Sequence, residues 1–265
     1  MSELSVKFYS RYEISFQDLE EMHIIFRKYY KNTELKTFKN DLDKKNGAFI
    51  LRKKSTGEIV GFSTLLEMKM IINGKKVFGV FSGDTIVEEE YWGKNPLTSA
   101  FVWYYMKKLF ANPFRPIYWF LISKGYKTYL LLTNNFLNYY PCYNKENQHL
   151  EDIMSGYCNY LFPEYFNEKK KVLDFGKGSQ SLKGGIAEIT SEMCSKYPKI
   201  AFFNERNPTW DLGTELPCVG EMTWGTIFNR IFVKPIVKQG RKLSSFLFPR
   251  REEQRISSSR RKAMP

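Results

Sequence analysis

A chain of 265 residues can form one large domain, or one domain with a sizeable extension. Apolar residues make up 43% of it and aromatic residues 17%, which excludes an intrinsically disordered protein. The net charge of +13 is unevenly placed, because the segment from Trp224 to Pro265 holds eleven Lys and Arg against two Glu and so carries +9. The main body is therefore only mildly basic.

The cysteines and histidines indicate a reduced protein without a metal. The four cysteines are far apart with no C-x-x-C pair, and the N-terminus lacks the apolar segment of a secretory signal, so we expect free thiols in a cytoplasmic protein. Two histidines and no Cys/His cluster predict no metal site. No segment reaches the roughly 20 uninterrupted apolar residues of a transmembrane helix. Any membrane contact is expected to be peripheral.

The residue pattern between Val6 and Val87 predicts two helices and four strands. Ser15 precedes apolar residues at helical spacing, which predicts a helix through Phe26, and a second short helix is expected at Phe38 to Asp41. Asn73-Gly74 is a hairpin signal between two apolar stretches. The expected strands are Val6 to Tyr9, Ala48 to Arg52, Ile59 to Met70 and Val77 to Val87.

Helices and strands then alternate. A helical pattern follows Pro96 and ends at Asn112-Pro113, and it is followed by an expected strand at Ile117 to Ile122 and a helix at Tyr126 to Asn134. This alternation indicates an α/β sheet with parallel neighbours. Further on we expect a helix at Leu150 to Leu161 and late strands at Ala201 to Phe203 and Cys218 to Met222.

This order of elements resembles the GCN5-related N-acyltransferase (GNAT) superfamily over Val6 to Pro141. Its sharpest local feature is Gly83-Asp-Thr-Ile-Val-Glu-Glu-Glu-Tyr-Trp-Gly-Lys-Asn-Pro-Leu97, which is similar to the strand, loop and helix that hold the donor pyrophosphate in that family. The resemblance implies an α/β fold with a mixed central sheet flanked by helices and a C-terminal extension. We expect the GNAT-like domain at 1–223, with an insertion at 142–200, and a basic amphipathic, partly disordered tail at 224–265.

The resemblance also implies how an acyl donor binds. In GNAT proteins a glycine-rich turn presents backbone N–H groups and the positive end of a helix to the donor phosphates, which assigns Trp92, Gly93, Lys94 and Asn95 to the donor. Where the family has Arg or Gln and then Gly or Ala, this sequence has Trp92, Asn95 and Leu97. The turn that binds the donor phosphates is therefore expected to be narrower. The co-substrate is expected to be acyl-CoA or acyl carrier protein, with no bound cofactor.

Acyl transfer of this type is usually direct, with a base that takes the amine proton and a backbone N–H that polarises the thioester carbonyl. The resemblance assigns the backbone role to Ile86 and Val87. Asp84 is the candidate base, because it is a carboxylate within an apolar strand where burial would raise its pKa. A solvent-facing or hydrogen-bonded structural Asp is the alternative interpretation.

A general acid for the leaving thiolate is expected among four tyrosines on or after the last helix of the resemblance, since a phenol can donate a proton. The sequence does not separate them, and Tyr139 and Tyr140 are taken as the catalytic candidates. Cys142 has no His and acid pair beside it in the sequence, so no nucleophilic role is expected. The four tyrosines are Tyr126, Tyr129, Tyr139 and Tyr140.

The tail combines an apolar helical face with basic residues, which suits an anionic bilayer or an acidic partner; docking on the protein's own core is the alternative. No nucleic-acid motif accompanies its charge, so nucleic acid is not the expected partner. The apolar face consists of Trp224, Ile227, Phe228, Ile231 and Phe232.

The resemblance therefore predicts an N-acyltransferase. It would move an acyl group, with a fatty chain favoured by the aromatic content, from a CoA or carrier-protein thioester to a primary amine of a small molecule, an amino acid or a peptide side chain. Two alternatives remain from other classes: a catalytically inactive binding module, or a protein that binds a membrane surface or nucleic acid through its tail.

Overall fold

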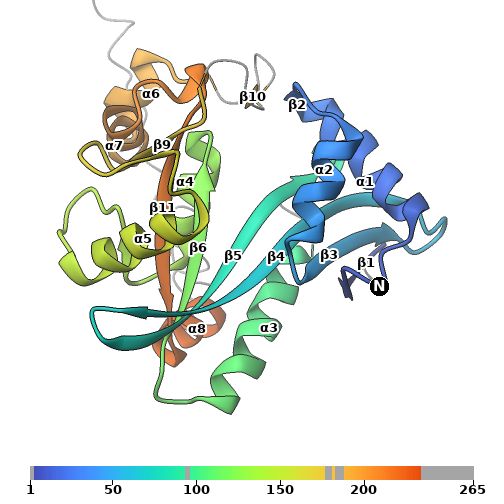
Figure 1. Cartoon of the computed structure of the whole chain (residues 1–265), viewed down its shortest axis with the longest axis horizontal. Helices are drawn as coiled ribbons and strands as arrows, with labels where there is room; N and C mark the ends of the chain where they lie inside the picture. The colour runs from blue at the N-terminus through green and yellow to red at the C-terminus, as the bar shows by residue number, and fades with distance from the viewer. Residues whose placement is uncertain (1–2, 93–95, 177–180, 183–187, 234–265) are drawn as a thin grey trace, which may run out of the picture. The chain divides into compact units, whose positions relative to one another are not determined.

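A computed structural model describes residues 3–92, 96–176, 181–182 and 188–233. The chain divides into two compact units, Met1–Thr226 and Ile227–Pro265. Figure 1 shows the helices and strands of the first unit along the chain.

The described helices lie between and after the strands. The α-helices are α1 Phe16–Tyr29, α2 Leu35–Asp43, α3 Leu97–Ala111, α4 Tyr126–Asn135, α5 Gln148–Leu161, α6 Ser191–Lys196, α7 Pro198–Arg206 and α8 Trp224–Phe228. Short 3₁₀ turns occupy Glu89–Tyr91 and Trp210–Leu212, and a π-helical turn occupies Asn229–Val233. The Oγ of Ser15 accepts a hydrogen bond from the backbone N–H of Asp18 at 3.0 Å, so α1 begins where the sequence predicts.

The main sheet has the strand order β1-β3-β4-β5-β6-β11-β9-β8, and β7 also pairs with β11. Among these strands β5 and β6 are parallel and the other pairs are antiparallel. The expected mixed α/β sheet flanked by helices is confirmed. The strands are β1 Leu4–Ser10, β2 Tyr30–Lys31, β3 Gly47–Lys53, β4 Ile59–Ile72, β5 Lys75–Val87, β6 Ile117–Ser123, β7 Tyr139–Tyr140, β8 Phe166–Asn167, β9 Val172–Asp174, β10 Ser181–Leu182 and β11 Thr214–Met222.

Helices cover both faces of this sheet (Figure 1). On β3, Ala48 and Ile50 join the core formed by α1 and α2, whereas the ring of Phe49 lies 4.7 Å from that of Phe101 on α3. Successive side chains of a strand point to opposite faces, so α3 lies on the opposite face from α1 and α2. On β6, Phe120 contacts α5 while Trp119 stacks on Phe136 at the end of α4.

The sheet opens between its two parallel strands. The β5–β6 ladder pairs only Phe78–Phe81 with Ile117–Phe120, although β5 continues to Val87 and β6 to Ser123. Beyond the ladder, β5 stays paired with β4 and β6 stays paired with β11. The carboxyl halves of the two strands therefore belong to separate halves of the sheet.

One expected strand is wrong. Ala201 to Phe203 lies within α7, which begins at Pro198. A proline suits the first turn of a helix because its missing N–H has no intrahelical partner there. Phe202 and Phe203 then pack against Tyr129 of α4, so an apolar run that suggested a strand is one face of a helix. The late strand expected at Cys218 begins earlier, at Thr214.

None of the helices in the described ranges has the length and apolar character needed to cross a membrane. The four cysteines are free thiols, and Cys158 and Cys218 are buried.

The close approach of α5 to β5 gives a test of the fold. A Cβ added at Gly79 would lie 2.0 Å from the Tyr157 hydroxyl oxygen, and that ring is fully buried. We expect Gly79→Ala to lower the free energy of unfolding by about 1–3 kcal/mol through overpacking. The added Cβ would also meet the Cζ and Cε1 atoms of this ring, so Tyr157→Leu, which lacks these atoms, should make Gly79→Ala less costly in that background.

The measurement is urea unfolding of the single and double variants. Gly225→Ala is the control, because its Cβ would meet its nearest atom, Thr223 Oγ1, at an ordinary 3.6 Å. A Gly79→Ala variant as stable as the wild type would contradict the packing of α5 on β5.

Candidate active site

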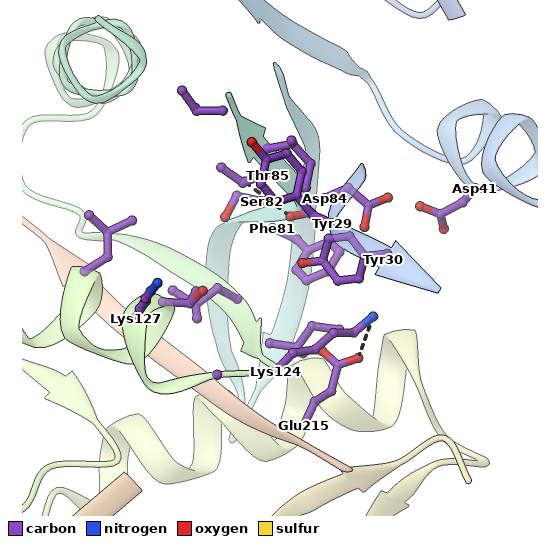
Figure 2. A pocket seen from close by; sticks show the side chains of 18 of the residues that line it. Tyr29, Tyr30, Asp41, Phe81, Ser82, Asp84, Thr85, Lys124, Lys127 and Glu215 are labelled. Atoms are coloured by element: carbon purple, nitrogen blue, oxygen red, sulfur yellow. Dashed lines mark hydrogen bonds and ion pairs between the residues drawn. The ribbon is translucent and has the colours of Figure 1, made fainter. Parts of the chain in front are cut away.

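A cavity of about 470 Å³ opens where β5 and β6 separate (Figure 2). One wall is the end of β5 from Phe81 to Val87, and the other is formed by β6 and the turn that follows it. The lining also includes Tyr29 at the end of α1, Tyr30 of β2, parts of α2, the first turn of α4 and Glu215 of β11. Three aromatic residues complete it: Trp92, Phe162 and Phe175. Ligand sites in open α/β sheets lie at the carboxyl ends of parallel strands, and this cavity has that position.

A β-bulge places Asp84 at the cavity. Ser63 pairs with Thr85 and Leu65 with Ser82, so Gly83 and Asp84 together stand opposite Thr64 alone. An extra residue of this kind bends the strand and redirects its side chains. A Cβ at Gly83 would lie 2.5 Å from Thr64 Oγ1, so the bulge depends on glycine at that position.

Asp84 lines the cavity and is half-buried. Figure 2 shows its carboxylate beside Tyr30 and directed toward Asp41. The pKa of Asp84 is raised from 3.8 to about 6, chiefly by burial and also by the charge of Asp41, while Lys124 and Lys45 oppose the shift. The expectation from sequence that burial would raise this pKa agrees with its surroundings. A carboxylate with a pKa near 6 is largely ionised at neutral pH and can still accept a proton.

Two lysines of the lining are each held by a carboxylate. Lys45 is buried, and its Nζ lies 3.0 Å from Asp41 Oδ2. Lys124 Nζ lies 3.3 Å from Glu215 Oε1 and 5.0 Å from the centre of the Tyr30 ring. Figure 2 shows the Lys124–Glu215 pair below Tyr30. Burial raises the pKa of Glu215, and Lys124 opposes that shift.

The sequence analysis did not identify Tyr30, Lys124 or Glu215. A signal for Lys124 was present, since it follows a predicted strand that has a parallel neighbour, and such strand ends carry binding residues. No comparable signal marked Glu215, because the strand that contains it was expected to begin three residues later. Burial raises the pKa of Tyr30, and Asp84 and Glu215 raise it further.

The backbone at the end of β5 offers a hydrogen-bond donor to the cavity. The N–H of Glu88 donates to the carbonyl of Val60 on β4 at 2.9 Å. Backbone groups alternate in direction along a strand, so the N–H of Ile86 also points to β4, and that of Val87 points to the β6 side. Of the two residues expected to polarise a carbonyl, Val87 therefore has the suitable orientation.

Trp92 lines the cavity beside Val87. Its Nε1 donates to the Val87 carbonyl at 2.8 Å, and Lys127 Nζ lies 4.7 Å from the centre of its ring. Trp92 is 43% exposed. The other residues expected to hold the donor phosphates, Gly93, Lys94 and Asn95, lie outside the described residues.

The structure does not bring Tyr139 and Tyr140 to Asp84. Both belong to β7, which pairs with Gly220 and Val219 of β11. Those same β11 residues pair with β6 on their other edge, so β11 lies between β7 and β6. Burial raises the pKa of Tyr140 to about 12 and also raises that of Tyr139. The phenols that line the cavity are Tyr29 and Tyr30, which precede the region where an acid was expected.

Among the residues that the structure describes, no group of His, Cys, Asp and Glu could hold a metal ion. Neither a protein-family model nor a curated protein matches the chain.

Solved structures of acyltransferases are similar to part of the chain. Saccharomyces cerevisiae N-myristoyltransferase with bound myristoyl-CoA is 14% identical, with a TM-score of 0.36, over 45% of this chain and 31% of its own. A probable N-acyltransferase from Enterococcus faecalis is 15% identical, with a TM-score of 0.37, and the match covers 51% of this chain and 33% of that protein. A GNAT family N-acetyltransferase from Escherichia coli in complex with CoA is 12% identical, with a TM-score of 0.33, and the match covers 47% of this chain and 64% of that protein.

The chain thus spans about a third of the length of the first two structures.

The raised pKa of Asp84 predicts a pH-dependent stability. A carboxyl whose pKa is higher in the folded than in the unfolded protein stabilises the fold at low pH, and this contribution is lost as the pH rises through the folded value, here between about 4 and about 6. Asp84→Asn removes the buried charge. We expect this variant to be more stable than the wild type at pH 7, by at most about 3 kcal/mol, with the difference vanishing near pH 4.

Chemical unfolding at several pH values measures this difference. Asp43→Asn is the control, since Asp43 is an exposed carboxylate of α2, and its replacement should change the free energy of unfolding by less than about 0.5 kcal/mol. A destabilised Asp84→Asn variant at pH 7 would show that Asp84 is held by favourable contacts, as a structural Asp would be.

Proposed function

We propose that the protein is an N-acyltransferase that moves an acyl group from a thioester to a primary amine. The observation that carries the proposal is Asp84, a carboxylate with a pKa near 6 in a cavity between two separating parallel strands. A base with a pKa near the working pH, a nearby backbone N–H and an apolar wall are what this reaction requires.

The proposed reaction is direct. The amine nitrogen attacks the thioester carbonyl carbon, Asp84 takes the proton that the nitrogen loses, and the Val87 N–H stabilises the negative charge on the carbonyl oxygen. The tetrahedral intermediate then collapses as the carbon–sulfur bond breaks, which gives an amide and a thiolate. A thiol has an ordinary pKa of roughly 8.5, so the thiolate can take the proton back from Asp84. No second acid is needed, which agrees with the positions of Tyr139 and Tyr140 on β7.

The remaining lining supports an acyl donor with an apolar chain. Phe81, Phe162 and Phe175 contribute a connected set of rings, with centroids 5.9 Å apart between the first two and 5.7 Å apart between the last two. Leu121 and Ile122 of β6 extend this apolar surface. Acyl-CoA and acyl carrier protein present their thioester on the same pantetheine arm, and we propose either as the donor. Saturation kinetics with thioesters of increasing chain length would identify the preferred acyl group.

An Asp84→Asn variant tests the chemistry. Asparagine keeps the size of the side chain and cannot act as a base, so turnover should fall by roughly 10²–10⁴-fold while the donor still binds. In the wild type, kcat/KM should rise with pH through about 6 as Asp84 ionises. Thiol release from acyl-CoA in the presence of a panel of primary amines measures turnover, and calorimetry measures donor binding.

Asp43→Asn is again the control, with turnover close to that of the wild type. Unchanged turnover in Asp84→Asn would remove Asp84 from the mechanism. If the wild type binds the thioester but no amine stimulates thiol release, the alternative of a binding module without catalysis holds instead.

We also propose that the segment beginning at Trp224 contacts an anionic membrane surface. Phe228 is 59% exposed and Ile231 is 41% exposed, and the sequence after Val233 is rich in Lys and Arg. Exposed apolar side chains next to basic residues are typical of interfacial segments.

Phe228→Asp together with Ile231→Asp should reduce sedimentation with vesicles that contain phosphatidylserine, and raised salt should weaken what remains. Ile71→Asp is the matched control, since Ile71 is 72% exposed on β4. If the wild type does not sediment with these vesicles at low salt, the membrane proposal fails.

A further inference from the structure

Two carboxylates face the cavity from opposite halves of the sheet. Asp84 lies on β5 and Glu215 on β11, and Tyr30 lies close enough to both that each raises the pKa of its phenol. Figure 2 shows Asp84 above the Tyr30 ring and Glu215 below it. The two carboxylates therefore border one end of the cavity, around Tyr30, and Figure 2 shows Lys127 away from both.

Glu215 keeps an unused acceptor. Its side chain is only 5% exposed, and its Oε1 is paired with Lys124 at 3.3 Å. Its Oε2 is buried and has no hydrogen-bond partner among the residues that the structure describes. A carboxylate can accept about four hydrogen bonds, and a buried oxygen that accepts none is costly, so a donor on an occupant of the cavity would stabilise this arrangement.

Asp84 also has acceptor capacity left. Within the part of the chain that the structure describes, no group donates a hydrogen bond to its carboxylate, although Lys45 and Lys124 act on it through their charges. An occupant that donates at both ends would satisfy Asp84 and Glu215 together.

The same end of the cavity is poorly suited to an anionic occupant. It carries three carboxylates, Asp41, Asp84 and Glu215, against two lysines. Both lysines are already paired, Lys45 with Asp41 and Lys124 with Glu215. A substrate carboxylate placed here would meet repulsion from Asp84 and would have to displace an existing ion pair. The charge therefore favours an acceptor that is cationic and carries no carboxylate.

We propose that the amine acceptor is an aliphatic diamine, with one amino group beside Asp84 and the second donating to Glu215. This inference rests on the proposed acyltransferase function and specifies its acceptor. Glu215 is then the residue that distinguishes a diamine from a monoamine, while Asp84 performs the same step with either.

Acceptor kinetics with a fixed acyl-CoA test this assignment. The wild type should use 1,4-diaminobutane with a kcat/KM roughly 10- to 100-fold above that of butylamine, as expected for one added hydrogen bond to a charged group. Ornithine, which adds a carboxylate to the same diamine, should be a poorer acceptor than 1,4-diaminobutane. Glu215→Gln should reduce the preference for diaminobutane over butylamine to within a few-fold of one, chiefly by raising the KM of diaminobutane.

Glu221→Gln is the matched control, since Glu221 lies on the same strand and accepts a hydrogen bond from Asn138 at 2.8 Å, away from the cavity lining. It should keep the wild-type preference. Calorimetric binding of diaminobutane and butylamine to the wild type gives a second measurement that needs no variant and no turnover.

Three outcomes overturn the proposal: equal use of butylamine and diaminobutane by the wild type, equal affinity for the two, or a preference that survives Glu215→Gln. In each case Glu215 only anchors Lys124, and acyl transfer to butylamine would show that the proposed function stands without this acceptor. Absence of transfer to every amine tested would instead count against the function itself.

Discussion

The early end of the β5–β6 ladder is the constraint on which the candidate site depends. Two parallel strands that paired along their whole length would fill the space between them with backbone hydrogen bonds. Here the pairing ends at Phe81 and Phe120, and each strand continues with a partner only on its other edge. The fold stays connected because β4 and β11 hold the diverging ends, and the freed edges provide both a cavity and backbone donors that face it.

The bulge on β5 places an ionisable side chain on the wall of this cavity. By placing two residues opposite Thr64, it directs Asp84 to a position where burial and Asp41 weaken its acidity, while two lysines limit the effect. Each lysine is held by a carboxylate on another element, Lys45 by Asp41 of α2 and Lys124 by Glu215 of β11. The basicity of Asp84 is thus set by groups from both halves of the sheet, and it depends on the geometry of the opening.

At Asp84, the burial that lowers the stability of the folded protein also gives the carboxylate a pKa suited to catalysis. An ionised carboxylate in a partly dry cavity is unfavourable for the folded state, and the same property gives it a pKa suited to a base. Glu215 is a similar case, because its buried Oε2 has no hydrogen-bond partner in the described part of the chain, which costs stability and leaves the oxygen free to accept a hydrogen bond. Both residues are understood more readily as parts of a binding site than as supports of the core.

Apart from the two-residue strand β2, the sequence by itself determined the order of helices and longer strands over the first 135 residues, because periodicity, Ser15 as a helix cap and Asn73-Gly74 as a turn are local signals. It also singled out Asp84, as a charge within an apolar strand. It failed at Ala201 to Phe203, where a short apolar run fits a strand or a helix equally well. Only the tertiary structure decided which strands separate, and with them which side chains meet. Glu215 comes from a strand more than 125 residues after Asp84, and Tyr139 and Tyr140 are kept apart from it by β11. Such proximity depends on long-range pairing, which local sequence patterns do not encode.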